Sequence, residues 1–230
     1  MIFCRLDLYF FPILDIYTPI DRTILGYKEL FSPIRRFSMK KAAVIHDLSG
    51  FGKCSLTAAI PVLSALGVQC CPVATAVLTG QTGYPCYHCT DLTAMLPDYI
   101  DAWGKNNAHF DAIYSGFLTG AEQISQVLDF IRQFREEHTL LLVDPVMGDD
   151  GNAYPFFTPG LLNGMKELTL KADVITPNLT EACLLADIPE NALLHCRTNT
   201  DLLKLAEDVA LRLQKKASHP QDVVITGVKC

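Results

Sequence analysis

LLLVDPVMGDDG, at residues 140–151, is the stretch of sequence that decides the fold. Four apolar residues followed by Asp-Pro predict a buried central strand, and the polar loop at its carboxyl end lies where open α/β sheets bind ligands. Asp144 would stand at the strand tip. Gly148 would let the chain turn so that Asp149 and Asp150 face the same crevice. Clustered carboxylate oxygens suit Mg²⁺, and the alternative is a solvated acidic turn.

Outward from this stretch, strands and helices alternate, which predicts a parallel sheet covered by helices on both faces. The expected strands lie at 42–46, 69–76, 112–115, 140–143, 172–176 and 223–226. The expected helices lie at 55–66, 92–103, 121–135, 158–168, from about 178, and 202–213. A glycine-bearing turn at 48–53 follows the first strand, and the polar loop at 79–91 is long enough to be functional. The fold class is therefore α/β, with three layers and a mostly parallel central sheet.

Composition indicates one globular domain. The chain has 230 residues, of which 50% are hydrophobic and 19% charged, and single α/β domains often reach this length. A net charge of −6 without clustered Lys or Arg argues against a nucleic-acid partner. No apolar run approaches the ~18 residues of a membrane span.

The nine cysteines are odd in number and follow no regular framework, which favours a reduced, cytoplasmic compartment. Cys86 and Cys89 form a CxxC, but no second pair has suitable spacing for zinc, so we expect free thiols.

Residues 1–38 show no sustained helical or strand period, and Arg5, Asp7 and Pro12 interrupt their apolar stretch. They predict an extension that is a poor signal peptide. Met39 is our expected natural start, with the folded domain at 39–230.

Several motifs occur in a fixed order: the glycine turn after the first strand, TGQTGY at 79–84, SGFLTGAEQ at 115–123, DPVMGD at 144–149 and DVITPNLTEACLL at 173–185. Together they resemble the pyridoxal and pyridoxamine (vitamin B6) kinases of the ribokinase-like superfamily, over residues 40–230. The resemblance implies ATP-dependent phosphorylation of the 5′-hydroxymethyl group of pyridoxal, pyridoxamine or pyridoxine, with ATP and Mg²⁺ as cofactors. It also implies a homodimer.

The resemblance assigns roles to individual residues. Substrate would contact Asp47, Thr82 and Phe117. ATP and its phosphates would contact Asp144, Thr176, Asn178, Glu181 and Thr226. The metal would be held by Asp144, Asp149 and Glu181. For Glu181 the competing explanation is simple capping of the helix that begins near Asn178.

Asp47 departs from the serine that many pyridoxal kinases carry at this place. A carboxylate here could pair with a protonated ring nitrogen or an aminomethyl group, or it could cap the following turn. His46, just before it, is expected to be a hydrogen-bonded histidine at a strand end, and we assign it no role.

The family's catalytic aspartate lies in a Gly-Thr-Gly-Asp element, and no such element occurs in this sequence. We therefore assign no catalytic residue and expect a ribokinase-like domain that is incomplete at the C-terminus, with exposed apolar faces and little kinase activity.

Two alternatives remain open at this point. One is a hydroxymethylpyrimidine (phosphate) kinase of thiamine synthesis, which shares the fold and many of these motifs. The other is a non-catalytic protein that binds a nucleotide or a B6 vitamer and has lost phosphoryl transfer.

Overall fold

The structure is a computed structural model that describes residues 39–228 except 155, 190–191, 194–195 and 197. Two units are distinguished along the chain, Met1–Ser38 and Met39–Cys230, and every described residue belongs to the second. The expected extension at 1–38 therefore lies outside the described residues.

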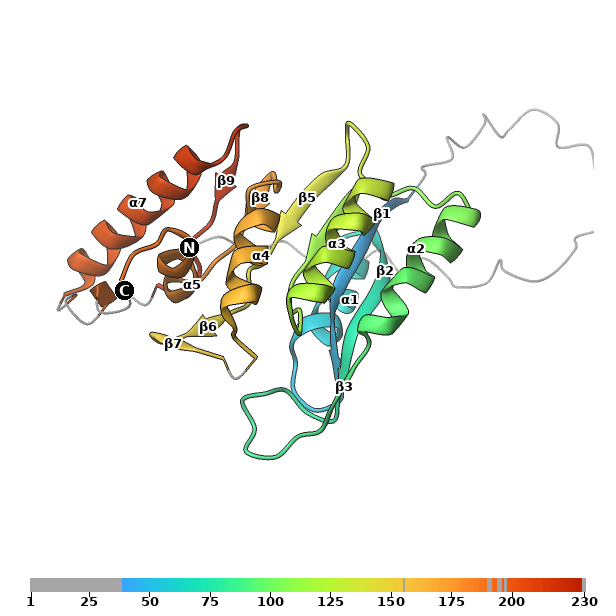
Figure 1. Cartoon of the computed structure of the whole chain (residues 1–230), viewed down its shortest axis with the longest axis horizontal. Helices are drawn as coiled ribbons and strands as arrows, with labels where there is room; N and C mark the ends of the chain where they lie inside the picture. The colour runs from blue at the N-terminus through green and yellow to red at the C-terminus, as the bar shows by residue number, and fades with distance from the viewer. Residues whose placement is uncertain (1–38, 155, 190–191, 194–195, 197, 229–230) are drawn as a thin grey trace, which may run out of the picture. The chain divides into compact units, whose positions relative to one another are not determined.

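A seven-stranded sheet forms the centre of the described unit (Figure 1). Its order is β3-β2-β1-β4-β5-β8-β9, and every pairing is parallel except that of β3 with β2. The strands are β1 (Lys40–Ser49), β2 (Val68–Leu78), β3 (Cys89–Asp91), β4 (Ala112–Ser115), β5 (Leu140–Val143), β8 (Val174–Ile175) and β9 (Asp222–Val223). Because the strands run parallel, the carboxyl ends of β1, β4, β5 and β8 meet at one edge.

The main core lies on one face of this sheet. Buried residues of β1, β4, β5 and β8 pack there against α2 (Leu96–Lys105), α3 (Ala121–Phe134), α4 (Pro159–Thr169), α5 (Leu179–Leu185) and α7 (Asn199–Lys216). The face of α3 that it buries carries Ile124, Val127 and Phe130, and the spacing of three residues matches one side of a helix. Among the described helices, none is both long and apolar enough to cross a bilayer.

The opposite face of the sheet is covered by α1 (Ser55–Ala65), whose Leu56 packs with Ala42 and Val44 of β1. Within the described part of the chain, the second core contains no other helix. Leu140 is 45% exposed and Val224 is 49% exposed. The predicted α/β fold, a mostly parallel sheet flanked by helices, is confirmed. On the second face α1 covers β1 and β2, whereas Leu140 at the start of β5 and Val224 just after β9 are exposed.

Two elements differ from the sequence prediction. The end of the expected loop at 79–91 forms β3, which adds an antiparallel edge strand by pairing with β2. The acidic loop after β5 forms a small hairpin of β6 (Gly148–Asp149) and β7 (Asn152–Ala153). Its two turn residues, Asp150 and Gly151, both have positive φ, as a two-residue type I′ hairpin requires.

Other boundaries agree closely with the prediction. The strands at 112–115 and 140–143 have the expected limits, and the helix expected at 121–135 ends at Phe134. The helix expected at 92–103 begins with a short 3-10 turn, η1 (Thr93–Met95), before α2.

Candidate functional site

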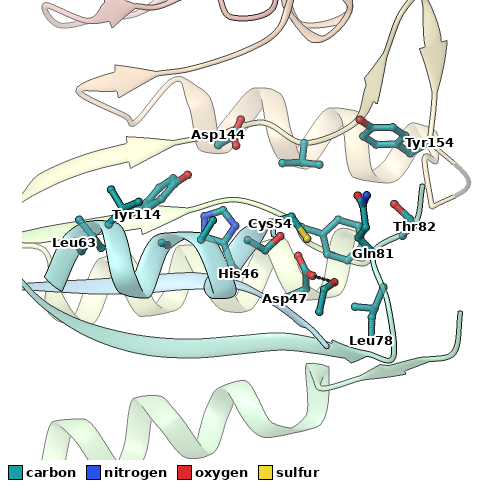
Figure 2. Close-up of a pocket in the computed structure, with 17 residues that line it drawn as sticks. His46, Asp47, Cys54, Leu63, Leu78, Gln81, Thr82, Tyr114, Asp144 and Tyr154 are labelled. Carbon is teal, nitrogen blue, oxygen red and sulfur yellow. Dashed lines mark hydrogen bonds between the residues drawn. The ribbon is translucent and has the colours of Figure 1, made fainter. Parts of the chain in front are cut away.

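A cavity of about 470 Å³ opens at the carboxyl ends of β1, β4 and β5 (Figure 2). Its walls are β1 and α1, the loop after β2, and the segments that follow β4 and β5. The polar side chains that line it are His46, Asp47, Ser49, Cys54, Ser55, Gln81, Thr82, Tyr114, Asp144 and Tyr154. Four of the predicted substrate or phosphate residues therefore line one cavity: Asp47, Thr82, Phe117 and Asp144.

The end of β1 contributes two adjacent residues to this cavity. Neighbouring side chains on a strand normally point to opposite faces, but the register of β1 against β2 shifts between His46 and Leu48. Asp47 is 5% exposed and accepts a hydrogen bond of 2.8 Å from the hydroxyl of Ser49. This bond comes from a side-chain hydroxyl and not from a backbone N–H, so it is not the cap that the alternative explanation for Asp47 proposed, but it orients the carboxylate at the cavity wall.

Phe117 is held in place by contacts from β2 and α3. The hydroxyl of Thr75 donates to the carbonyl oxygen of Phe117 at 2.9 Å, and the Phe117 ring meets Phe156 edge to face at 5.6 Å. Gln123 is fully buried, accepts from the N–H of Thr119 and donates to the carbonyl of Thr75. The SGFLTGAEQ motif therefore locks the loop that presents an aromatic ring to the cavity.

Thr82 lies on the loop after β2. The N–H of Gln81 donates to the carbonyl of Phe51 at 2.9 Å, and the rings of Phe51 and Tyr84 pack at 4.9 Å. The loop at 79–91 is thus bonded to the turn at 48–53 after β1, and residues of both segments line the cavity.

Asp144 stands at the tip of β5, as expected. Burial raises the pKa of Asp144 to about 6, and a hydrogen bond with the side chain of Thr176 acts in the opposite direction. Burial also raises the pKa of Tyr114 to about 12, with a further contribution from the Asp144 charge. Asp144 is therefore a carboxylate whose ionisation is easily changed by a nearby positive charge.

Asn178 and Glu181 form a different kind of arrangement, which we call the capping network. Asn178 Oδ1 accepts from the N–H of Glu181 at 3.0 Å, and Glu181 Oε2 accepts from the N–H of Asn178 at 2.8 Å. Glu181 Oε1 accepts from the N–H of Met147, and Asn178 Nδ2 donates to the carbonyl of Gly148 at 2.7 Å. The network is a capping box that also ties α5 to the segment after β5.

Glu181 is 3% exposed, and burial raises its pKa to about 8, although the bonds from the N–H groups of Asn178 and Met147 lower it. The charge of Asp144 raises the pKa of Glu181 further, so the two carboxylates interact electrostatically. Glu181 therefore caps α5, as the competing explanation predicted. Its role in metal or phosphate binding stays a prediction from the resemblance.

The three residues predicted to hold a metal are not gathered into one cluster. Asp149 is exposed on the β6–β7 hairpin, where its carboxylate accepts from the N–H of Asp150. Within the described ranges, no group of three or more His, Cys, Asp or Glu side chains is placed to hold a metal ion. Asp144 fits a Mg²⁺ ion that keeps several waters and takes one or two carboxylates plus substrate phosphates.

Thr176 and Thr226 complete the predicted set. Thr176 reaches Asp144, while Thr226 is exposed, forms a bridge with Asn178, and donates its N–H to the carbonyl of Pro177 at 2.9 Å. Thr176 therefore lies beside the Asp144 side of the cavity. Cys86 and Cys89 are both free thiols.

His46 is the residue on which the sequence prediction was wrong. It is 3% exposed, yet neither ring nitrogen has a hydrogen-bond partner among the described residues. Burial lowers its pKa to about 4, so the ring is neutral near pH 7. The HDLSG motif indicates a strand end, but it does not indicate whether the His46 ring nitrogens will find hydrogen-bond partners there. Tyr114 and Tyr154 also line the cavity and were missed. Tyr114 lies within β4, and Tyr154 directly follows β7, so neither stands in a motif that the sequence analysis singled out.

Comparison with known proteins agrees with this geometry. The sequence model of the phosphomethylpyrimidine kinase family matches residues 52–230. A Bacteroides thetaiotaomicron protein, provisionally named phosphomethylpyrimidine kinase and crystallised with pyridoxal, is 44% identical with a TM-score of 0.75. The match covers 84% of this chain and 64% of that one.

Two further relatives carry B6 kinase names. Pyridoxal kinase from Lactobacillus plantarum is 30% identical with a TM-score of 0.70, over 84% of this chain and 66% of that one. The pyridoxine/pyridoxal/pyridoxamine kinase of Bordetella avium is 35% identical over 143 residues, which are 59% of this chain and 47% of that protein. The chain thus spans about half to two thirds of these relatives' length. It belongs to the pyridoxal kinase and phosphomethylpyrimidine kinase family, with the ribokinase-like fold.

Proposed function

We propose that this chain binds a B6 vitamer in the cavity at the carboxyl ends of β1, β4 and β5, as part of an ATP-dependent kinase for the vitamer's 5′-hydroxymethyl group. The observation that carries the proposal is the convergence of Asp47, Thr82, Phe117 and Asp144 on one cavity. The pyridoxal in the crystals of the Bacteroides relative supports the same ligand class.

The substrate half of the cavity would contain Asp47, Thr82 and Phe117. Asp47 would accept a charge-assisted hydrogen bond from a protonated pyridine nitrogen or from the aminomethyl group of pyridoxamine. The hydroxyl of Thr82 can donate or accept, and the Phe117 ring offers an apolar surface to a planar heterocycle.

The donor half would begin at Asp144 and Thr176. We propose that Asn178, Glu181 and Thr226 shape the ATP side, because phosphoryl transfer depends mainly on positioning and on neutralising negative charge. Bound Mg²⁺ would supply part of that neutralisation. Asp144 is the carboxylate best placed to contact it, since both Glu181 oxygens already accept backbone N–H groups. Asp149 would contribute only if the β6–β7 hairpin turned toward the cavity.

A hydroxymethylpyrimidine is the second candidate substrate. The name of the matching family and that of the Bacteroides relative favour it. Both candidates are small aromatic heterocycles with a hydroxymethyl acceptor, so binding assays with each ligand separate them.

The test is calorimetric titration of the 230-residue chain with pyridoxine, pyridoxamine and 4-amino-5-hydroxymethyl-2-methylpyrimidine, with and without ATP and Mg²⁺. We expect the vitamers to bind more tightly than the pyrimidine, and Asp47→Ser to weaken pyridoxamine binding about tenfold. Asp98→Ser, in α2 outside the cavity, is the matched control. Tighter binding of the pyrimidine would contradict the proposal of a B6 vitamer as ligand. Unchanged pyridoxamine binding by Asp47→Ser would contradict the proposed role of Asp47.

Turnover is a separate question from binding. Because the sequence contains no Gly-Thr-Gly-Asp, we propose that the 230-residue chain binds its ligands with little phosphoryl transfer, which is the non-catalytic alternative. A coupled ADP-release assay on a sample of confirmed intact mass tests this, and robust turnover would overturn it.

We also propose that residues 39–230 form the kinase domain and that the protein is a cytoplasmic homodimer. N-terminal mass analysis of the native protein tests the Met39 start, and light scattering tests the dimer.

A further inference from the structure

Ser49 is the last residue of β1, and its side chain meets that of Asp47 at the wall of the cavity (Figure 2). The Ser49 hydroxyl donates to Asp47 Oδ2 at 2.8 Å. Ser49 is 1% exposed and Asp47 is 5% exposed, so little water competes for this hydrogen bond. A hydrogen bond in such surroundings is stronger than the same bond at the surface.

The sheet holds Ser49 in place independently of Asp47. Ser49 pairs with Leu78 in the parallel ladder between β1 and β2, and the N–H of Gly50 donates to the carbonyl of Leu78 at 2.9 Å. The hydroxyl is therefore a donor on a fixed part of the backbone, and the Asp47 carboxylate is oriented by it.

The two oxygens of the Asp47 carboxylate have different surroundings. Oδ2 accepts from Ser49, whereas Oδ1 accepts no hydrogen bond among the described residues. In the same part of the chain, the side-chain atoms that are sealed from solvent without a partner belong to His46, Ser115 and Gln126. Oδ1 is not one of these sealed atoms. Because Asp47 lines the cavity, Oδ1 is the oxygen that a bound ligand can reach.

No stronger group competes for this carboxylate. Among the described residues, no Lys or Arg lines the cavity, and none forms an ion pair with Asp47. A side chain that must be ordered when a ligand binds lowers the affinity, and a side chain that is already ordered does not. The Ser49 hydroxyl orders Asp47 before the ligand arrives.

We propose that Ser49 is a positioning residue for the substrate: its hydroxyl holds Oδ2 of Asp47, so that Oδ1 accepts a hydrogen bond from the protonated nitrogen of the heterocycle. This inference rests on the proposed function, in which Asp47 binds that nitrogen. It adds that the affinity for a cationic vitamer depends on a residue that acts through Asp47 and not by contact with the ligand.

Calorimetric titration of the full chain with pyridoxamine tests this role. We expect Ser49→Ala to weaken binding about fivefold, because the carboxylate loses the donor that orients it. Ser49→Thr keeps the hydroxyl and should stay within about twofold of the wild type. Ser64→Ala, at an exposed serine of α1 outside the cavity, is the matched control and should leave the affinity unchanged.

A double-mutant cycle separates positioning from a general structural role. In an Asp47→Ser background no carboxylate remains to be oriented, so Ser49→Ala should change the affinity for pyridoxamine by less than about twofold. A purely structural role for Ser49 would cost the same factor in both backgrounds. A crystal structure of the wild type with pyridoxamine needs no variant. In it the ligand nitrogen should lie on Oδ1, with the Ser49 hydroxyl still on Oδ2.

The outcomes separate the two proposals. If the wild type binds no vitamer, the proposed function fails and this inference falls with it. If Asp47→Ser leaves pyridoxamine binding unchanged, the roles of Asp47 and Ser49 both fail, although the cavity still binds a vitamer. If Asp47→Ser weakens binding and Ser49→Ala does not, only this inference is overturned. Equal costs of Ser49→Ala in the two backgrounds, or a ligand nitrogen that displaces Ser49 from Oδ2, would also overturn it.

Discussion

The cavity wall and the capping network lie at neighbouring strand ends and treat buried polar groups in opposite ways. In the network, both Glu181 oxygens and both ends of the Asn178 amide have backbone partners. In the cavity, His46 is equally buried and has no partner among the described residues. Paired groups hold the chain in place, whereas an unpaired buried polar group lowers stability. The difference shows that burial alone does not decide whether a polar group at a strand end is hydrogen-bonded.

The largest expected effect is the loss of the capping network's carboxylate. Glu181→Ala leaves the buried N–H groups of Met147 and Asn178 without acceptors, and we expect it to lower the free energy of unfolding by about 3–4 kcal/mol. Urea denaturation measures this. Glu167→Ala, which removes an exposed carboxylate on α4, should cost less than about 0.5 kcal/mol. Equal costs for the two variants would remove the contrast between the network and the surface.

Gly116→Ala tests the packing of the cavity wall. Its Cβ would overlap the His46 ring, so we expect a loss of about 2–3 kcal/mol in thermal or urea unfolding. Gly120→Ala is the control, because a Cβ there meets nothing within 4 Å. The same Gly116→Ala change in a His46→Ala background should cost less than about 1 kcal/mol. Additive costs would show that the ring does not occupy this space.

The pH dependence of stability tests the buried charge of Glu181. Its pKa is about 8 in the folded chain and 4.5 without burial, so the folded state keeps a proton that the unfolded state has released. Between these values stability falls as pH rises. From pH 6.5 to 8, where most of the titration of Asp144 is already complete, we expect a loss of about 2 kcal/mol.

Glu181→Gln should remove most of that slope, whereas Glu167→Gln should retain it. Urea unfolding at pH 6.5, 7.2 and 8.0 gives the comparison. A wild-type slope that survives in Glu181→Gln would mean that another group titrates in this window.

The smallest expected effect concerns the hairpin beside the network. Gly151 has φ +78° and donates its N–H to the hydroxyl of Thr180 at 2.9 Å. Gly151→Ala should cost about 1 kcal/mol, because L-residues are strained in the left-handed region. Asp150→Asn, at φ 48°, should be nearly neutral, since asparagine tolerates that region. A neutral Gly151→Ala would show that the turn is not of the type I′ form.

Local pattern and tertiary burial agree over much of the fold, and there the sequence was sufficient. The apolar runs at 112–115 and 140–143 predicted β4 and β5, and the helical spacing after Gly120 predicted α3. Asp144 at the tip of β5 followed from the Asp-Pro boundary. The Asp-Gly pair at 150–151 was a hairpin signal in the sequence that our prediction of an acidic loop did not use.

The sequence by itself determined the alternating α/β architecture and the motifs that resemble the B6 kinases, because both depend on patterns among residues that are close together in the chain. Only the tertiary structure decided which strand-end groups have partners. Glu181 meets Met147 across 34 residues, and the His46 ring is enclosed by β4 and Gly116 about 70 positions away. Hydrogen-bond satisfaction depends on such distant neighbours, so it becomes visible only when the strand ends are brought to one edge of the sheet.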